Sequence, residues 1–238
     1  MINIGFLDIT SPLMIPQRGQ SQVGGGDANW GNVSLRLPLD TNFTDASTNA
    51  HIVTAEGDCQ IVTSEKKYGA GSAQFDNVGD RFSIPTHTSL DLNGVDSTVE
   101  FWFYPFALGT YDILYSNNTS GTNFAGFELL TQSDGSLLII APSTTAASAA
   151  SLITTGSWYH IAVVRESTTT KVYLGGIERI STSLTYVNGQ NWYWGDRVTG
   201  AGSGQYPMHG YIDDIRITKG VARYTTAFTP PTEAYPTS

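Results

Sequence analysis

The sequence predicts an all-β protein, a two-sheet antiparallel sandwich preceded by an extended N-terminal arm. Charged residues make up only 14% of the chain, whereas Thr, Ser, Gly and Asn, which suit strands and turns better than helix interiors, are abundant. From Asp27 onward, short β-branched and aromatic runs alternate with turn residues. No long amphipathic pattern interrupts them, so we expect about a dozen strands joined by hairpins.

Side chains alternate between two faces in the runs predicted to be central strands. In Ser97–Tyr104, Val99, Phe101 and Phe103 share one face, and Trp158–Arg165 shows the same period. Both faces of each run are largely apolar or aromatic, as expected for strands covered on both sides. The strand candidates are Val33–Leu39, Gln60–Thr63, Ala73–Phe75, Arg81–Ile84, Ser97–Tyr104, Tyr111–Ser116, Phe124–Thr131, Ser136–Ala141, Trp158–Arg165, Thr170–Leu174 and Gly210–Thr218.

Turn residues separate the candidates. Asp134-Gly135, Gly175-Gly176 and Asn188-Gly189 are typical of tight hairpin turns. Ser143–Ser151 contains only Ser, Thr and Ala, and we expect it to be a loop.

Residues 1–26 form a unit separate from the domain at residues 27–238. Pro12 and Pro16 break a short strand-like start, and Gly19–Gly26 is predicted to be a flexible polar link. The arm cannot build a core of its own, so it is either a disordered leader or an anchor that orders on a partner. The residues that make it too apolar for a mere spacer are Ile2, Ile4, Phe6, Leu7, Leu13, Met14 and Ile15.

The charge and the single cysteine exclude several classes of protein. A net charge of −9 argues against binding to nucleic acid or to anionic membranes, and is compatible with calcium or a basic partner. Cys59 has no partner for a disulfide, which favours production in a reducing cytosol, and we expect it to pack as a small apolar side chain. The chain shows neither a signal peptide nor an apolar run long enough to span a membrane.

Several phrases of the sequence, taken in order, carry a family resemblance. They are Asp27–Leu35, Leu39–Ser47, Lys67–Asp76, Ile84-Pro85, Thr98–Pro105, Trp158–Arg165, Gly210–Tyr224 and Phe228–Pro231. Together they resemble the laminin-G-like, concanavalin-A-like jelly-roll family, and most of all the variety found in structural proteins of marine bacteriophages and their bacterial hosts.

The resemblance covers residues 27–232 and implies a two-sheet antiparallel jelly-roll sandwich. Gly175-Gly176 stands where the family usually has an Asn-Gly turn, a departure that still allows a hairpin. Function is implied less firmly, because one fold hosts many functions.

The resemblance also implies a calcium ion where the Asp-rich loop after the first strand meets the last strand. Asp45 and Asp213 would be its side-chain ligands, helped by loop carbonyls near Asn49 and His51. The alternative is that Asp213 caps loop amides and Asp45 makes an Asx-turn.

We expect no catalytic site. Glycosidases need two carboxylates flanking the scissile bond, but Glu100 stands alone and the side chains of Asp213 and Asp214 are expected on opposite faces. The histidines lack metal-ligand spacing, and His160 is expected to be a packed, hydrogen-bonded ring.

Aromatic residues near Tyr186–Trp194 offer a ligand hypothesis, because exposed rings make good recognition surfaces. Alternation places Trp192 and Trp194 in the core, which leaves Tyr186 and Tyr193 as the possible ligand contacts.

The sequence therefore predicts a non-enzymatic virion structural protein, such as a capsid decoration protein, a head fibre or a tail component, made in the host cytoplasm. Residues 1–26 would hold it to other virion proteins or to symmetry mates in a homo-oligomeric assembly. The alternative is a carbohydrate-binding adhesin or receptor-contacting module whose partners are cell-surface glycans.

Overall fold

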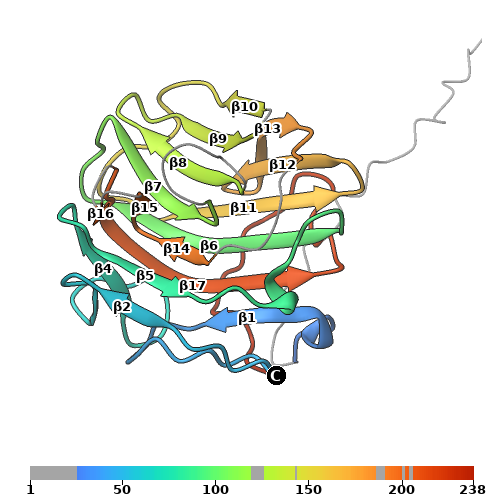
Figure 1. Ribbon diagram of the computed structural model, residues 1–238, viewed down its shortest axis with the longest axis horizontal. Helices are drawn as coiled ribbons and strands as arrows, with labels where there is room; N and C mark the ends of the chain where they lie inside the picture. The colour runs from blue at the N-terminus through green and yellow to red at the C-terminus, as the bar shows by residue number, and fades with distance from the viewer. Residues whose placement is uncertain (1–25, 119–125, 143, 186–190, 200–201, 204–205) are drawn as a thin grey trace, which may run out of the picture.

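The computed structural model describes residues 26–118, 126–142, 144–185, 191–199, 202–203 and 206–238. It confirms the predicted class, because two antiparallel sheets pack face to face (Figure 1). Within these residues the helical elements are two short 3-10 turns, η1 (Trp30–Asn32) and η2 (Thr88–Leu90), and no helix has the length and apolarity needed to cross a membrane.

The larger sheet has eight strands and is built around its longest strand, β17. One edge of β17 pairs with β6 along most of its length, while the other pairs first with β4 and then with β1. The register shifts between Asp213 and Arg216, where Asp214 has a φ of 53°. The order is β13 (Ile177–Thr182), β12 (Thr169–Leu174), β11 (Tyr159–Glu166), β6 (Ser97–Pro105), β17 (His209–Lys219), β4 (Ser72–Asp76) and β3 (Gln60–Val62), with β1 (Val33–Leu37) also beside β17.

The smaller sheet has seven strands and covers one face of the larger sheet. A separate two-stranded ribbon, β15 (Val198–Thr199) and β16 (Gly202–Ser203), follows it in the chain. The order in the smaller sheet is β10 (Thr144–Ala147), β9 (Leu137–Ala141), β8 (Glu128–Gln132), β7 (Tyr111–Ser116), β14 (Trp192–Trp194), β5 (Arg81–Ile84) and β2 (Thr54–Glu56).

The predicted loop at Ser143–Ser151 was wrong, because it contains β10, which pairs with β9 at the sheet edge. Its small residues carry no apolar alternation, and backbone pairing with β9 makes the strand. The hairpin at Gly175-Gly176 is confirmed, since both glycines have positive φ and join β12 to β13. The edge strands β2 and β13 were missed, as was β14, which lies inside the sheet.

Side chains from both sheets meet in one apolar core. The inward face of β6 carries Val99, Phe101 and Phe103, as predicted. Trp192 and Trp194 are fully buried there, and the buried Cys59 joins the same cluster, so both predictions are confirmed.

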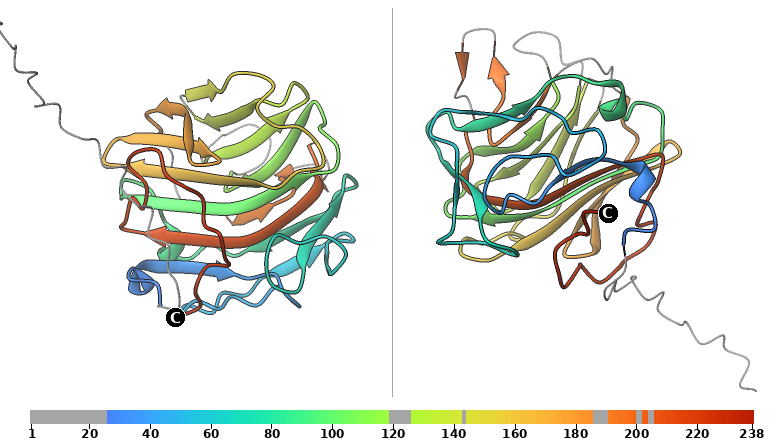
Figure 2. Two further views of the ribbon diagram at one scale, coloured as in Figure 1. Left: turned by 180° about the vertical axis from the view of Figure 1, so that it is seen from behind. Right: turned by 90° about the horizontal axis from the view of Figure 1, so that it is seen from below.

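The outer face of the larger sheet is partly covered by the C-terminal segment, residues 220–238, which crosses the strands in Figure 2 (left). Phe228 stacks on Tyr224 with ring centroids 3.6 Å apart and packs on Tyr173 of β12. The segment seals polar side chains that point outward from β6 and β17.

Glu100 lies at the centre of this sealed region and is fully buried. Its Oε1 accepts hydrogen bonds from Arg216 Nε at 3.0 Å and Nη2 at 2.8 Å, and its Oε2 accepts one from the Tyr224 hydroxyl at 2.8 Å. Arg216 Nη1 lies 2.9 Å from Asp27 Oδ2, and Arg223 Nη2 lies 2.6 Å from the same oxygen. The charges are thus paired and hydrogen-bonded, as burial requires.

A second group of contacts joins the network to the end of the C-terminal segment. Arg36 forms an ion pair with Asp214 and donates a hydrogen bond of 2.7 Å to the Tyr235 carbonyl. Arg216 lies over the Tyr235 ring, with Cζ 4.0 Å from its centroid. His160 Nε2 lies 2.7 Å from the Tyr235 hydroxyl, so the expected packed, hydrogen-bonded histidine is confirmed.

The two ends of the described domain meet in the same region. The Asp27 amide donates a hydrogen bond of 2.9 Å to the Ser238 carbonyl. The predicted anchor lies outside the described residues, and so do all seven of its apolar side chains, Ile2, Ile4, Phe6, Leu7, Leu13, Met14 and Ile15.

Because Glu100 is charged and buried, the free energy of unfolding depends on pH. Burial alone would raise the pKa of Glu100, but Arg216, His160 and Arg223 outweigh burial and hold that pKa well below its usual range. Because the folded-state pKa is the lower one, the carboxylate contributes stability at pH values above about 4.3, and this contribution is lost as the pH falls toward the folded-state pKa.

We predict that Glu100→Gln lowers the free energy of unfolding by about 3–5 kcal/mol at neutral pH, because it removes one of the two carboxylates that pair with the buried Arg216 and leaves Asp27 as its remaining counter-charge. The difference from the wild type should shrink below about pH 4, where the unfolded wild type takes up a proton at Glu100 and the stability that the charged carboxylate gives the folded state is progressively lost. Urea unfolding over a pH series measures both effects, with the exposed Glu166→Gln as control. An equal loss for the two variants would contradict the central role of Glu100.

Candidate functional site

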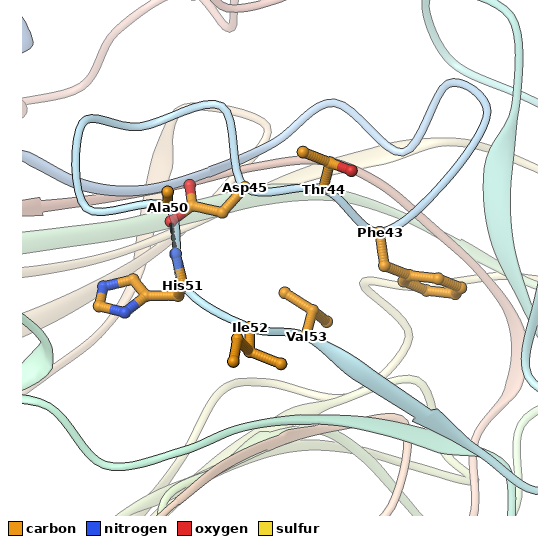
Figure 3. A pocket seen from close by; sticks show the side chains of 7 residues that line it. All are labelled: Phe43, Thr44, Asp45, Ala50, His51, Ile52 and Val53. Atoms are coloured by element: carbon orange, nitrogen blue, oxygen red, sulfur yellow. Dashed lines mark hydrogen bonds between the residues drawn. The ribbon is translucent and has the colours of Figure 1, made fainter.

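The loop that carries Asp45 closes on itself around the carboxylate. Asp45 Oδ1 accepts hydrogen bonds from the Arg36 and Ser47 amides, both at 2.9 Å, and Oδ2 accepts from Ser47 Oγ at 2.9 Å and from the His51 amide at 2.8 Å. Figure 3 shows the carboxylate turned toward the backbone of Ala50 and His51. Four donors fill the acceptor positions that a carboxylate offers.

A shallow pocket of ≈ 410 Å³ opens beside this loop (Figure 3). Its side chains are mixed, with the apolar Phe43, Val53 and highly exposed Ile52 next to His51. His51 Nε2 lies 2.9 Å from Ser89 Oγ, which links the loop to η2.

Asp213 has a different set of partners. Its Oδ2 accepts hydrogen bonds from the amides of Lys67 at 2.8 Å and Tyr68 at 3.0 Å, while its buried Oδ1 has no hydrogen-bond partner among the described residues. Burial raises the pKa of Asp213 to about 7.

These hydrogen bonds match the predicted alternative to a calcium site, in which Asp45 makes an Asx-turn and Asp213 caps loop amides. Within the part of the chain that the structure describes, the two carboxylates share no hydrogen-bond partner, and four donors already occupy the acceptor positions of Asp45. The side chains therefore do not fit a calcium ion held by both. Among the described residues, no cluster of three or more His, Cys, Asp or Glu side chains is placed to hold a metal.

Of the two predicted ligand contacts, Tyr186 and Tyr193, the structure describes only the second. Tyr186 lies outside the described residues. Tyr193 is half-buried on β14, where its hydroxyl accepts a hydrogen bond of 3.4 Å from Asn191 Nδ2.

A different set of side chains, which the sequence did not indicate, forms a row across the uncovered part of the larger sheet. We call it the aromatic–glutamine row. Tyr104 on β6 is paired in register with Tyr211 on β17, Tyr211 with Gln74 on β4, and Gln74 with Gln60 on β3. Trp158, just before β11, extends the row beyond Tyr104, with ring centroids 5.5 Å apart.

Strand alternation fixes the direction of the row. Because Phe103, Ile212 and Phe75 point into the core, their neighbours Tyr104, Tyr211 and Gln74 point outward. The rings of Tyr104 and Tyr211 lie 5.7 Å apart, and the Trp158 indole nitrogen donates a hydrogen bond of 2.7 Å to Glu65. All three side chains are half-buried, so part of each remains accessible to a ligand.

The glutamine end of the row opens into a hollow of ≈ 350 Å³, which we call the acidic hollow. Gln60, Gln74, Asp58, Asp76 and Asp80 line it. Asp80 is buried and accepts hydrogen bonds from the amides of Asp58 at 2.6 Å and Asp76 at 3.0 Å. Burial, together with the neighbouring Asp76 carboxylate, raises the pKa of Asp80. Asp58 and Asp76 are exposed at the rim.

Lys67 bounds the row on the side of the C-terminal segment. Its ammonium nitrogen lies 4.1 Å from the centroid of the Trp102 ring, and burial lowers its pKa. The Tyr68 hydroxyl next to it donates a hydrogen bond of 2.7 Å to the Pro231 carbonyl. The covered and uncovered parts of the sheet therefore meet at these two residues.

A family model described as the concanavalin A-like lectin/glucanases superfamily, of the laminin G type, matches residues 76–223. The chain belongs to this superfamily. No curated protein matches the sequence.

Solved structures share the superfamily fold at low sequence identity. The binding domain of botulinum neurotoxin serotype D is 14% identical, with a TM-score of 0.62, over 83% of this chain and 51% of that one. Domain 4 of AbnA, an extracellular GH43 arabinanase from Geobacillus stearothermophilus solved with arabinotriose, is 18% identical, with a TM-score of 0.60, over 79% of this chain and 93% of that one.

A structure of botulinum neurotoxin type C, whose cell entry depends on two ganglioside molecules, is 13% identical, with a TM-score of 0.59, over 82% of this chain and 50% of that one. The chain thus spans about half the length of the neurotoxin structures it matches.

We predict that Asp45→Asn lowers the free energy of unfolding by about 1–3 kcal/mol, because the amide group would face backbone donors. The loss should be the same in EDTA and in calcium, as measured by chemical denaturation. Asp91→Asn is the matched control, because Asp91 accepts one amide hydrogen bond, from Asn93. A loss confined to calcium buffer would instead assign Asp45 to a metal site.

Proposed function

We propose that this protein is a non-catalytic carbohydrate-binding module that contacts a receptor glycan through the aromatic–glutamine row. The observation that carries the proposal is the register that lines up Trp158, Tyr104, Tyr211, Gln74 and Gln60 across the free part of one sheet.

The composition of the row suits a sugar chain. Aromatic rings offer apolar faces, and Tyr and Trp add a polar edge, so they recognise ligands that are apolar on one side and hydroxylated on the other. Glutamine amides both donate and accept hydrogen bonds, which matches sugar hydroxyls. Four strand spacings give the row a length of about 19 Å, which favours an oligosaccharide over a single sugar.

The fold of the solved relatives supports the proposal. One is a domain of an arabinanase in complex with arabinotriose, another is the binding domain of a neurotoxin, and a third is the receptor-binding domain of a mosaic neurotoxin. At these identities the likeness concerns the fold, so a sugar ligand for this chain rests on the row itself.

We propose that the module is non-catalytic because its carboxylates are not placed to cleave a sugar chain. Glu100 is buried beneath the C-terminal segment and paired with Arg216, so it cannot reach a glycosidic bond. Asp58 and Asp76 lie at the exposed rim of the hollow, and both oxygens of the buried Asp80 accept hydrogen bonds from the backbone amides of these two residues.

We further propose that the module is displayed on a virion, with residues 1–26 as its anchor. The support is the sequence resemblance to structural proteins of bacteriophages and the apolar composition of the arm. In this setting the sandwich would be the receptor-contacting part, and the arm would bind other virion proteins or symmetry mates.

We predict that Tyr104→Ala and Trp158→Ala each weaken binding to an oligosaccharide found on a glycan array by on the order of tenfold, or about 1.4 kcal/mol. Isothermal titration calorimetry measures the affinity, and circular dichroism checks the fold. Tyr193→Ala, on the opposite sheet, is the matched control and should bind normally. If Tyr193→Ala alone loses binding, the site lies on the smaller sheet instead.

We predict that deletion of residues 1–26 leaves a folded sandwich with a nearly unchanged melting temperature but abolishes incorporation into virions or oligomers. Calorimetry and mass spectrometry of purified particles measure the two effects separately. Glycan binding should survive the deletion. Normal occupancy of the truncated protein would place the attachment surface on the sandwich.

A further inference from the structure

Resting on the proposed glycan site, we infer that Phe106 and His209 bind a side branch of the ligand, so that the ligand is a branched oligosaccharide rather than a linear one. The rings of these two residues form a pair, with centroids 5.1 Å apart. His209 begins β17 and Phe106 follows the last residue of β6, the two strands that also carry the paired rings of Tyr211 and Tyr104. The aromatic–glutamine row therefore has a second pair of rings beside it.

The register of β6 and β17 places the second pair on the same face of the sheet as the row. Gly210 is paired with Pro105 between the two pairs of rings, and the Phe106 amide donates a hydrogen bond of 3.0 Å to the His209 carbonyl. Side chains two residues apart on a strand share a face and lie about 7 Å apart. The second pair thus stands about 7 Å to the side of the row.

The two long sides of the row differ in how they are covered. On one side, Lys67 lies over the ring of Trp102, the outward residue that precedes the row on β6, and the Tyr68 hydroxyl is bonded to the Pro231 carbonyl. These contacts close that side with the loop around residue 67 and the C-terminal segment. On the other side the Phe106 side chain is 60% exposed. A branch that leaves a bound sugar chain is therefore directed toward Phe106.

The chemistry of the second pair suits a sugar ring. Phe106 offers an exposed apolar face, and the imidazole of His209 is tilted by 33° to it, which places a polar ring next to an apolar one. The imidazole interacts with the charge of Asp112 on β7, but its nitrogens form no hydrogen bond within the described part of the chain. A branch sugar can thus cover Phe106 and exchange hydrogen bonds with His209.

A linear chain does not account for the second pair. The row runs across the strands from Trp158 to Gln60, and its middle member is Tyr211, next to which the second pair lies. A linear chain that follows the row passes the pair at a distance, and one that turns along the strands to reach the pair leaves both ends of the row. A branch carried near the middle of the chain contacts both sets of residues.

Matched linear and branched oligosaccharides test the inference by isothermal titration calorimetry on the full chain. The probes are mannopentaose with and without one galactose branch, xylopentaose with and without one arabinose branch, and cellopentaose with and without one xylose branch. On a backbone that binds, the branched member should bind about threefold to tenfold more tightly, as expected for one added ring contact. Phe106→Ala should bring the two affinities to within a factor of about two, and His209→Ala should also reduce the difference.

Ile177→Ala is the matched control. Ile177 is likewise a large apolar side chain on the larger sheet with a similar exposure of 52%, but it begins β13, at the edge of the sheet farthest from β3. Its removal should leave the preference for the branched member intact. Because Phe106 is exposed, Phe106→Ala should fold, and its melting temperature checks this.

The outcomes separate the branch site from the proposed function. Equal binding of the linear and branched members, or a preference that is unchanged in Phe106→Ala or in His209→Ala, overturns the branch site but leaves the row. Failure of all six probes to bind in a Tyr104-dependent manner also overturns the branch site. Failure of every array glycan to bind in that manner overturns the proposed function itself.

Discussion

The buried ion pair between Glu100 and Arg216 is the constraint on which the rest of the architecture depends. Two charges on the outer face of a sheet can be buried under a covering segment only when each is paired and hydrogen-bonded. Here Tyr224, Arg223 and Asp27 supply the remaining partners of the buried network. The need to exclude water explains why the C-terminal segment is held across the sheet, stacked and hydrogen-bonded as far as Tyr235. The network thus fixes both ends of the domain against β6 and β17.

This cover also determines where a ligand can bind. The C-terminal segment occupies the part of the larger sheet that carries Glu100 and His160, and the outward side chains of the remaining part form the aromatic–glutamine row. The boundary at Lys67 and Tyr68 separates the two regions. The outer face of the larger sheet therefore has two regions. One is covered and contains the buried charges, and the other is an open surface.

The sequence alone predicted the features that depend on the local alternation of side chains along a strand. The inward Val99, Phe101 and Phe103, the buried pair Trp192 and Trp194, and the two-sided burial of β6 and β11 all follow from period-two patterns. The row could not be predicted in this way, because it depends on the register of strands distant in sequence. The partners of Asp45 could not be predicted either, because they are three backbone amides and the Ser47 hydroxyl, which the path of the loop brings close. The strand β10 escaped prediction because its small residues carry no apolar signal.

The same ion network has a consequence for how the chain folds. Asp27 and Arg216 are 189 positions apart, and Glu100 and Arg216 are 116 positions apart. Such pairings have a large loop-closure entropy and are formed late, so a protein dominated by them folds slowly. During synthesis, Glu100 has no counter-charge from Arg216 until β17 has been translated. Until then β1, β4 and β6, the strands that pair with β17, expose unpaired edges. Folding of the sandwich should therefore be concerted and should be completed only after β17 has been synthesised, with the nascent chain most prone to aggregate just before that point.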